Sequence, residues 1–258
     1  METINILFIT LIGLAWGSFL NVVIYRLPRE MSLLKPPSTC PGCGKRIRPY
    51  DNIPVLSYLV LRGKCRVCGT GIPVSYFIVE LLTPGVFLLL YVHHGRIVGL
   101  PFVAACLFVS AMIALAIIDF YHQILPDAIT LPGLLLALAY GLVRQDMTFR
   151  QSLIGAATGS GFLLFIYGAY FLVRRKEGLG MGDVTMMLLV GAYLGWLPTV
   201  LTLILGSFAG AIVGVVLILV RKKDMQFALP FGTFLAPAAV AAVLWGERIV
   251  KAYFGLYK

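Results

Sequence analysis

Long apolar runs alternate with short polar segments along nearly the whole chain. A helix needs about 20 consecutive apolar residues to cross a bilayer, and runs near this length recur throughout the 258 residues. They predict an all-α fold, a multi-pass membrane helix bundle of about eight spans. The expected spans are roughly 4–27, 74–93, 97–118, 128–143, 152–173, 183–196, 198–220 and 231–250, of which the fourth and sixth are short for a crossing.

One long polar segment interrupts this pattern between the first and second spans. It predicts three parts: a first span at 1–27, a loop domain at 28–73 and a membrane core at 74–258. The amino-acid composition agrees with a membrane protein: 60% of the residues are hydrophobic and only 12% are charged. A soluble domain needs more charge to cover its surface. We therefore expect the lipid bilayer to surround most of the chain.

Basic residues gather in alternate connections between the predicted spans. A net charge of +10 would suggest a nucleic-acid partner in a soluble protein, but in a membrane protein the position of each charge matters more. Nine of the 21 Lys and Arg residues lie within 26–73, and the turns 174–176 and 221–223 hold three each. The positive-inside rule places these segments in the cytoplasm. We expect no nucleic-acid partner.

Four of the five cysteines form two close pairs in the polar loop. The pairs are Cys40-x2-Cys43 and, after 21 intervening residues, Cys65-x2-Cys68. This spacing is typical of a tetrahedral four-thiolate Zn²⁺ site. The alternative is two disulfides, which a reducing cytoplasm disfavours. Because the loop has few large apolar residues, zinc would supply much of its folding free energy, and we interpret the site as structural.

Four carboxylates lie at or inside predicted spans, where charges are costly and indicate candidate functional sites. They are Glu80, Asp119, Asp127 and Asp183. Asp127 directly precedes a span and is interpreted as a helix N-cap. Asp183 follows a glycine-rich turn, so a cap is the alternative to a functional role there. Asp119 ends an apolar run, where the helix macrodipole disfavours a negative charge, and a cap does not explain it.

The predicted topology links two of these aspartates. The third span runs inward and ends at Asp119, the next two go out and back, and the sixth begins on the inward side at Asp183. Two aspartates brought together in a low-dielectric site can share one proton. One can then act as a base towards water while the other donates a hydrogen bond to a scissile carbonyl. This is the chemistry of an aspartic protease.

Several segments occur together in a characteristic order. They are "GSFLNVVIYRLP" at 17–28, the tetracysteine loop with "IRPYDNIPVLSYLVLRGKCRVCG" at 47–69, "VELLT" at 79–83, "IDFYHQILPD" at 118–127, "GMGD" at 180–183 and "PFGTFLA" at 230–236. In these segments, which extend over nearly the whole chain, the sequence resembles the type IV prepilin peptidases. That family consists of bifunctional leader peptidase/N-methyltransferases, and its members are aspartic proteases of the GxGD type.

The resemblance implies that Asp119 and Asp183 are the catalytic aspartates, with Gly180, Gly182 and Asp127 in support. It implies cleavage of a short basic leader from prepilins and pseudopilins, just after a glycine. The implied location is the bacterial inner membrane, with the active site at its cytoplasmic face. Proteins of this kind serve type IV pili and type II secretion.

The resemblance also implies a second activity, methylation of the new N-terminal residue, which is usually Phe. S-adenosylmethionine would be the methyl donor, and the tetracysteine loop and Glu80 would belong to the methyl-transfer part. Two departures from the family pattern stand out. Thr185 lies where relatives often have a lysine, and "SYFIVE" at 75–80 replaces "RYPxVE". The residues alone show no glycine-rich nucleotide-binding motif, so the methyl donor follows from the resemblance only.

Other functions remain open at this stage. A GxGD protease of the presenilin or signal-peptide-peptidase kind is the nearest alternative, but it would lack the tetracysteine loop. A membrane transporter can also use broken helices and intramembrane carboxylates. A zinc-stabilised scaffold without catalysis would use the aspartates as caps and packing residues. The most informative single observation would be the distance between the Asp119 and Asp183 carboxyls in the folded chain.

Overall fold

The computed structural model describes residues 2–175, 180–221 and 229–255 of the chain. Helices make up its regular structure, and the described residues contain no strand, only two isolated bridges in the polar loop. This confirms the predicted all-α fold. The elements are α1 (Glu2–Arg26), η1 (Leu27–Arg29), η2 (Pro49–Asn52), α2 (Leu56–Val60), α3 (Val74–His93), α4 (Leu100–His122), α5 (Asp127–Val143), α6 (Phe149–Arg174), α7 (Met181–Leu194), α8 (Trp196–Arg221) and α9 (Gly232–Gly255).

Eight of the described helices coincide with the eight predicted spans. Five of them, α1, α3, α4, α6 and α8, are long and apolar enough to cross a membrane. Three are shorter, namely α5, α7 and the apolar part of α9 at 232–246. The fourth and sixth spans, expected to be short, are α5 and α7. The structure therefore confirms a multi-pass helical membrane protein.

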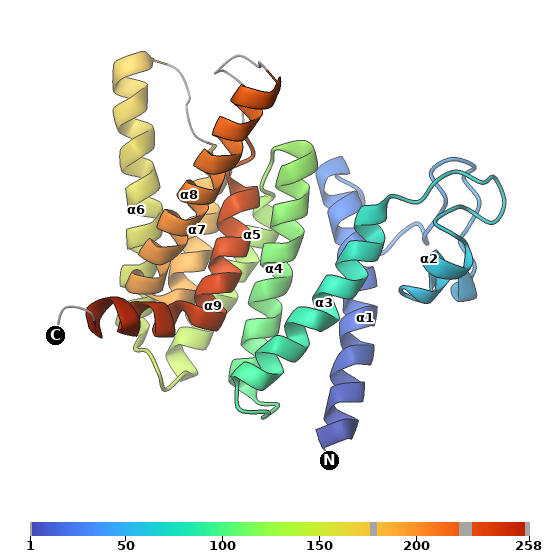
Figure 1. Ribbon diagram of the computed structural model, residues 1–258, viewed down its shortest axis with the longest axis horizontal. Coiled ribbons are helices and arrows are strands. Elements are labelled where there is room, and N and C mark those ends of the chain that lie inside the picture. Colours follow the sequence, from blue (N-terminus) through green and yellow to red (C-terminus); the bar gives the residue numbers. More distant parts are fainter. Residues whose placement is uncertain (1, 176–179, 222–228, 256–258) are drawn as a thin grey trace. The chain divides into compact units, whose positions relative to one another are not determined.

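The chain divides into two compact units, Met1–Phe102 and Val103–Lys258. In the first unit α3 packs along α1 (Figure 1). The contact is close because α1 presents glycines: a Cβ at Gly13 would lie 2.6 Å from Pro84 Cα, and one at Gly17 would lie 3.0 Å from Glu80 Cα. Small residues allow such backbone approach between membrane helices. The division by role, into residues 1–27, 28–73 and 74–258, remains a prediction.

The polar loop of the first unit lies between α1 and α3 and carries the short helices η2 and α2 (Figure 1). Just before α2, Val55 has φ 63° and ψ −52°, and the Leu56 N–H donates to the Pro54 carbonyl at 2.6 Å. This is a γ-turn with a positive φ at its centre, a rare and strained form. A β-branched residue is especially disfavoured there, so neighbouring contacts must hold Val55 in place.

In the second unit α7 is the central helix. It packs against α5, α6, α8 and α9, and its residues Met186, Met187, Leu189 and Val190 are almost fully buried. Surrounding protein replaces lipid around most of this helix, which explains how 14 residues suffice at the centre of a membrane bundle.

Glycines set the closest helix contact of this unit. Gly155 of α6 and Gly191 of α7 face each other so tightly that a Cβ on either one would collide with the backbone of the other. One turn further along α6, a Cβ at Gly159 would lie 2.7 Å from the Met187 carbonyl oxygen. These contacts match the small-xxx-small packing of membrane helices. They fix the position of α7, which begins at the GMGD segment.

Candidate active site and metal centre

Asp119 lies in the last turn of α4 and is 5% exposed. Its Oδ2 accepts a hydrogen bond from the Thr233 N–H at 2.7 Å, and the Thr233 hydroxyl lies 3.1 Å from the same oxygen. That hydroxyl is also 3.2 Å from the Ala116 carbonyl oxygen. Thr233 is the second residue of α9. The N-terminal end of α9 therefore compensates a charge that the C-terminal end of α4 disfavours.

Asp183 is the third residue of α7 and is 8% exposed. The N-cap of α7 is Gly180, and no side chain caps this helix. The alternative interpretation of Asp183 as a side-chain cap is therefore wrong. Its Oδ1 has no hydrogen-bond partner among the described residues, whereas a Cβ at Gly180 would lie 3.3 Å from Oδ2. A buried carboxylate oxygen without a partner is rare and calls for a functional explanation.

The fold brings Asp119 and Asp183 together, although 63 residues separate them in the sequence. Asp119 Oδ2 accepts the Thr233 N–H at the start of α9, and Asp183 follows Gly182 at the start of α7. Leu125, in the connection between α4 and α5, packs against both helix starts. A Cβ at Gly182 would lie 2.9 Å from Leu125 Cβ, and one at Gly232 would lie 3.0 Å from Leu125 Cδ1. Both glycines thus allow the two aspartates to approach.

Asp127 does not cap α5, contrary to expectation. The N-cap is Pro126, and Asp127 is the first residue of the helix. Pro126 adopts an extended conformation (ψ 128°), which moves the helix start one residue ahead of the predicted position. The Asp127 carboxylate instead lies 3.5 Å from the Thr130 hydroxyl. Thr130 in turn contacts Thr185 at 3.4 Å, and Thr185 donates to the Gly182 carbonyl oxygen at 3.0 Å.

This chain of contacts links α5 to the GMGD turn and gives Thr185 a local role. It places Asp127 beside residues that shape the turn, and the supporting role of Asp127 stays a prediction.

The four loop cysteines converge in the first unit. The Sγ atoms of Cys40, Cys43, Cys65 and Cys68 all lie within 4.8 Å of one another, and none is in a disulfide. The Sγ atoms of Cys40 and Cys68 are 3.7 Å apart. Zinc–sulfur bonds of about 2.3 Å in a tetrahedron place neighbouring sulfurs about 3.8 Å apart. The donor set and its spacing therefore fit a tetrahedral metal ion.

Each cysteine pair is held by the same backbone arrangement. The Gly44 N–H donates to the Cys40 carbonyl oxygen at 2.8 Å, and the Gly69 N–H donates to that of Cys65 at 2.9 Å. Both glycines have positive φ, 68° and 72°, which explains why glycine follows the second cysteine of each pair. We call the turns at 40–44 and 65–69 knuckles. They bring together the two cysteine pairs of the predicted four-thiolate site.

Polar contacts around the knuckles stabilise the loop. Arg66 donates to both carboxylate oxygens of Asp51, at 2.6 to 3.0 Å, so η2 is tied to the second knuckle. Hydrogen bonding from Arg66 lowers the pKa of Asp51 below its usual value. Hydrogen bonds from the Thr70 side chain and backbone lower the pKa of Cys68 to about 6. That thiol is thus close to the thiolate form that a metal ion requires.

Comparisons with known proteins identify the family of the chain. Residues 11–94 match the family model of the bacterial peptidase A24 N-terminal domain, and residues 106–215 match that of the type IV leader peptidase family. The chain belongs to the type IV leader peptidase family. No solved structure matches it significantly.

Curated relatives of this leader peptidase match most of the chain. The Pseudomonas putida protein named "Prepilin leader peptidase/N-methyltransferase" is 40% identical, over 93% of this chain and 90% of its own. The Pseudomonas aeruginosa protein of the same name is 36% identical, over 94% and 91%. A Myxococcus xanthus protein, also of that name, is 41% identical over 84% of this chain and 64% of its own.

Glu80, the fourth carboxylate, serves the loop of the first unit. It lies on α3, and its Oε2 accepts the Val55 N–H at 2.7 Å. This hydrogen bond holds the strained turn in front of α2. Glu80 lies in the first unit, and the aspartate pair lies in the second. A role of Glu80 in methyl transfer stays a prediction.

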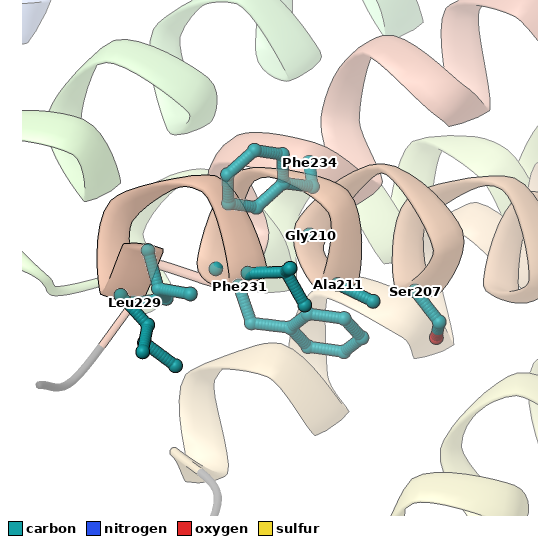
Figure 2. A pocket seen from close by; sticks show the side chains of 9 residues that line it. Ser207, Gly210, Ala211, Leu229, Phe231 and Phe234 are labelled. Atoms are coloured by element: carbon teal, nitrogen blue, oxygen red, sulfur yellow. The ribbon is translucent and has the colours of Figure 1, made fainter. Parts of the chain in front are cut away.

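No individual role was predicted for Thr233 and Gly232, although their segment at 230–236 is among those that carry the family resemblance, and both lie against Asp119 Oδ2. The signal available was weak: Pro230 and Gly232 indicate a helix start, but nothing in the sequence pairs this start with α4. The flanking Phe231 and Phe234 line a groove of about 420 Å³ along α8. Figure 2 shows them beside the small residues Ser207, Gly210 and Ala211.

Proposed function

We propose that this leader peptidase is a membrane aspartic endopeptidase that removes the leader of type IV prepilins and pseudopilins and methylates the new N-terminus. One observation carries the peptidase half of the proposal. Two buried carboxylates, Asp119 and Asp183, come together from separate helices, and one of them has an oxygen without a partner. Neither a cap nor an ion pair among the described residues accounts for this pair.

The chemistry follows from a shared proton between the two carboxylates. One carboxylate accepts a proton from water, whose oxygen attacks the scissile carbonyl carbon. The other donates its proton to the carbonyl oxygen, which gives a neutral tetrahedral diol. The diol collapses when one carboxylate takes a hydroxyl proton back and the other protonates the leaving nitrogen, so the C–N bond breaks. The pair returns to its starting state.

Cleavage at the cytoplasmic face, after a glycine, is part of the proposal. The segments richest in Lys and Arg, 26–73, 174–176 and 221–223, are expected in the cytoplasm. The GMGD turn that carries Asp183 follows one of these segments directly. On this basis we infer that the aspartate pair lies near the inner surface of the bacterial inner membrane, where prepilins for pili or type II secretion would present their leaders.

The tetracysteine cluster is proposed to bind structural zinc. Cys40, Cys43, Cys65 and Cys68 would hold the ion, which cross-links the two knuckles and supplies folding free energy to a loop with a small core. Zinc has no proposed role in a reaction step. The residues of the loop act by shaping the surface in front of α3.

S-adenosylmethionine is the proposed methyl donor, on the strength of the relatives' names. Its sulfonium group is cationic and favours a nearby carboxylate. The first unit, which matches the A24 N-terminal domain, offers Glu80 between the loop and α3. One oxygen of Glu80 is engaged by Val55. The loop domain with Glu80 is therefore the proposed methyl-transfer part.

The peptidase proposal is tested by Asp119→Asn and Asp183→Asn in the purified full-length protein. An amide cannot share the proton or activate water, so cleavage of a prepilin should fall by at least about 1,000-fold in each variant. Mass spectrometry of the substrate measures the cleaved fraction.

Asp127→Asn is the matched control, because it makes the same chemical change near the same turn. Its contact with Thr130 survives in the amide, and cleavage should stay within about threefold of the unaltered protein. Retained cleavage by either Asp119→Asn or Asp183→Asn would refute the assignment of the pair.

A further inference from the structure

The two carboxylates of the proposed active site have unequal surroundings. Asp119 Oδ2 receives two donors from a single residue, the N–H and the hydroxyl of Thr233. Asp183 has one oxygen against Gly180 and the other without a hydrogen-bond partner in the described part of the chain.

This difference separates the chemical states of the two groups. Hydrogen bonds donated to a carboxylate favour its ionised form, and the N-terminal end of a helix favours a negative charge. Both act on Asp119. Asp183 Oδ1 is buried and receives no hydrogen bond from the described residues. The shared proton is best placed on such an oxygen, because a protonated carboxyl group is neutral and can itself donate a hydrogen bond.

Thr233 is also held in a fixed orientation. Its hydroxyl lies between Asp119 Oδ2, at 3.1 Å, and the Ala116 carbonyl oxygen, at 3.2 Å. Asp119 and Ala116 lie on α4, whereas Thr233 belongs to α9. Thr233 thus joins the start of α9 to the last turns of α4, and its backbone position determines where its N–H points.

We propose that Thr233 is a positioning residue that fixes Asp119 as the base of the pair and leaves Asp183 to carry the shared proton. This inference rests on the proposed function. Asp119 accepts the proton of the attacking water, and Asp183 gives its proton to the carbonyl oxygen. When the diol collapses, Asp183 takes a hydroxyl proton back and Asp119 passes its proton to the leaving nitrogen.

Thr233→Val and Thr233→Ser provide the test of the positioning role. Valine keeps the shape and the backbone N–H but removes the hydroxyl, whereas serine keeps both donors. We expect Thr233→Val to lower kcat about tenfold or more, with KM within twofold, and Thr233→Ser to retain more than half of kcat. Thr233→Ala removes the same hydroxyl without a second methyl group and should behave as valine does.

Covalent labelling tests the division of roles in the unaltered protein. An apolar epoxide is opened by a carboxylate, which forms an ester and leaves an alkoxide that takes a proton from water. A diazo ester reacts with a carboxylic acid, which protonates the diazo carbon before N₂ leaves and the ester forms. Peptide mass spectrometry should find the epoxide on Asp119 and the diazo reagent on Asp183.

The possible outcomes distinguish this inference from the proposed function. Unchanged kcat in folded Thr233→Val and Thr233→Ala, or the two labels on the opposite aspartates, would overturn the role of Thr233 while the loss of activity in Asp119→Asn stands. Equal losses in the serine and valine variants would also overturn it. Active Asp119→Asn protein would instead remove the proposed function itself.

Discussion

At the scale of single residues, Asp119 lies where its own helix disfavours a negative charge, and a different helix compensates. The C-terminal turn of α4 presents carbonyl groups, whereas the start of α9 presents N–H groups and the Thr233 hydroxyl. Opposed helix ends of this kind hold a charge without a basic side chain. A lysine or arginine would neutralise the carboxylate and reduce its use as a base.

Gly182 allows a close approach that no other residue permits. A Cβ there would lie 2.9 Å from Leu125 Cβ and 3.4 Å from the Leu125 carbonyl oxygen. Gly182→Ala should therefore displace the turn that carries Asp183, lowering cleavage about tenfold or more and stability by about 1–3 kcal/mol. Cleavage kinetics and thermal unfolding of the purified protein measure the two effects.

Gly161→Ala is the control for Gly182→Ala. Gly161 lies within α6, and a Cβ there would meet nothing within 4 Å. Alanine should raise stability by up to about 1 kcal/mol because it favours a helix more than glycine does. If Gly182→Ala cleaved as well as Gly161→Ala, Leu125 would not constrain the turn.

At the scale of elements, the hydrogen bond from Val55 to Glu80 joins the polar loop to α3. Removing it in Glu80→Ala leaves a strained γ-turn without its restraint. We expect the free energy of opening at 53–60 to fall by about 1–3 kcal/mol, which is typical of hydrogen bonds to charged groups. Hydrogen exchange measured by mass spectrometry reports this directly.

Two further variants serve as controls for Glu80→Ala. Glu80→Gln keeps an acceptor oxygen and should restore most of the protection, and Glu30→Gln, at an exposed acid of the same unit, should change nothing. Equal exchange in Glu80→Ala and the unaltered protein would show that the turn is held by other contacts.

The metal centre belongs to the same element scale, and its loss should separate the two activities. Serine at Cys40, Cys43, Cys65 and Cys68 removes thiolate ligands, because hydroxyls bind zinc poorly, and should unfold the knuckles. Methylation should fall more than about tenfold, and cleavage less than about threefold. Mass spectrometry of the processed N-terminus counts cleaved and methylated products in one sample.

Cys106→Ala controls for thiol loss outside the cluster, since Cys106 is a buried residue of α4. It should leave both activities near their usual levels. A parallel loss of cleavage and methylation in the cluster variant would mean that the loop serves substrate binding for both reactions.

At the scale of the whole molecule, α6 offers a direct test of membrane topology. Its 26 residues extend about 39 Å, enough to cross a bilayer. A cysteine at Arg175, just after α6, should react with a membrane-impermeant thiol reagent from the cytoplasmic side only. A cysteine at Gln145, before α6, should react from the opposite side only.

Both positions are exposed in the structure, so each should react readily once the reagent reaches it. Labelling of the two cysteines from the same side would show that α6 does not cross the membrane. Labelling at position 175 from outside and at position 145 from the cytoplasm would show that α6 has the opposite orientation. The aspartate pair would then lie at the other face of the membrane.

The apolar pattern was sufficient to predict the helices, because burial in lipid imposes length and hydrophobicity on every span. The cysteine knuckles could also be predicted from the sequence, because the thiolate ligands and the glycine of each knuckle are close together in the chain. The contact between Thr233 and Asp119 could not be predicted from the sequence. The two residues are 114 positions apart and meet only when α9 packs within the second unit. The cap expected at Asp127 was wrong because Pro126 is the N-cap of α5 and Asp127 is already the first residue of the helix.

The short length of α7 affects how water, the second reactant of a hydrolysis, reaches the site. Fourteen residues rise about 21 Å, whereas the hydrocarbon layer is about 30 Å thick. A hydrolase in a membrane must be reached by water, and a helix some 9 Å shorter than the layer leaves room for water beyond its ends, one of which carries Asp183. We expect residues added to α7 to reduce the access of water to Asp183 without changing either carboxylate.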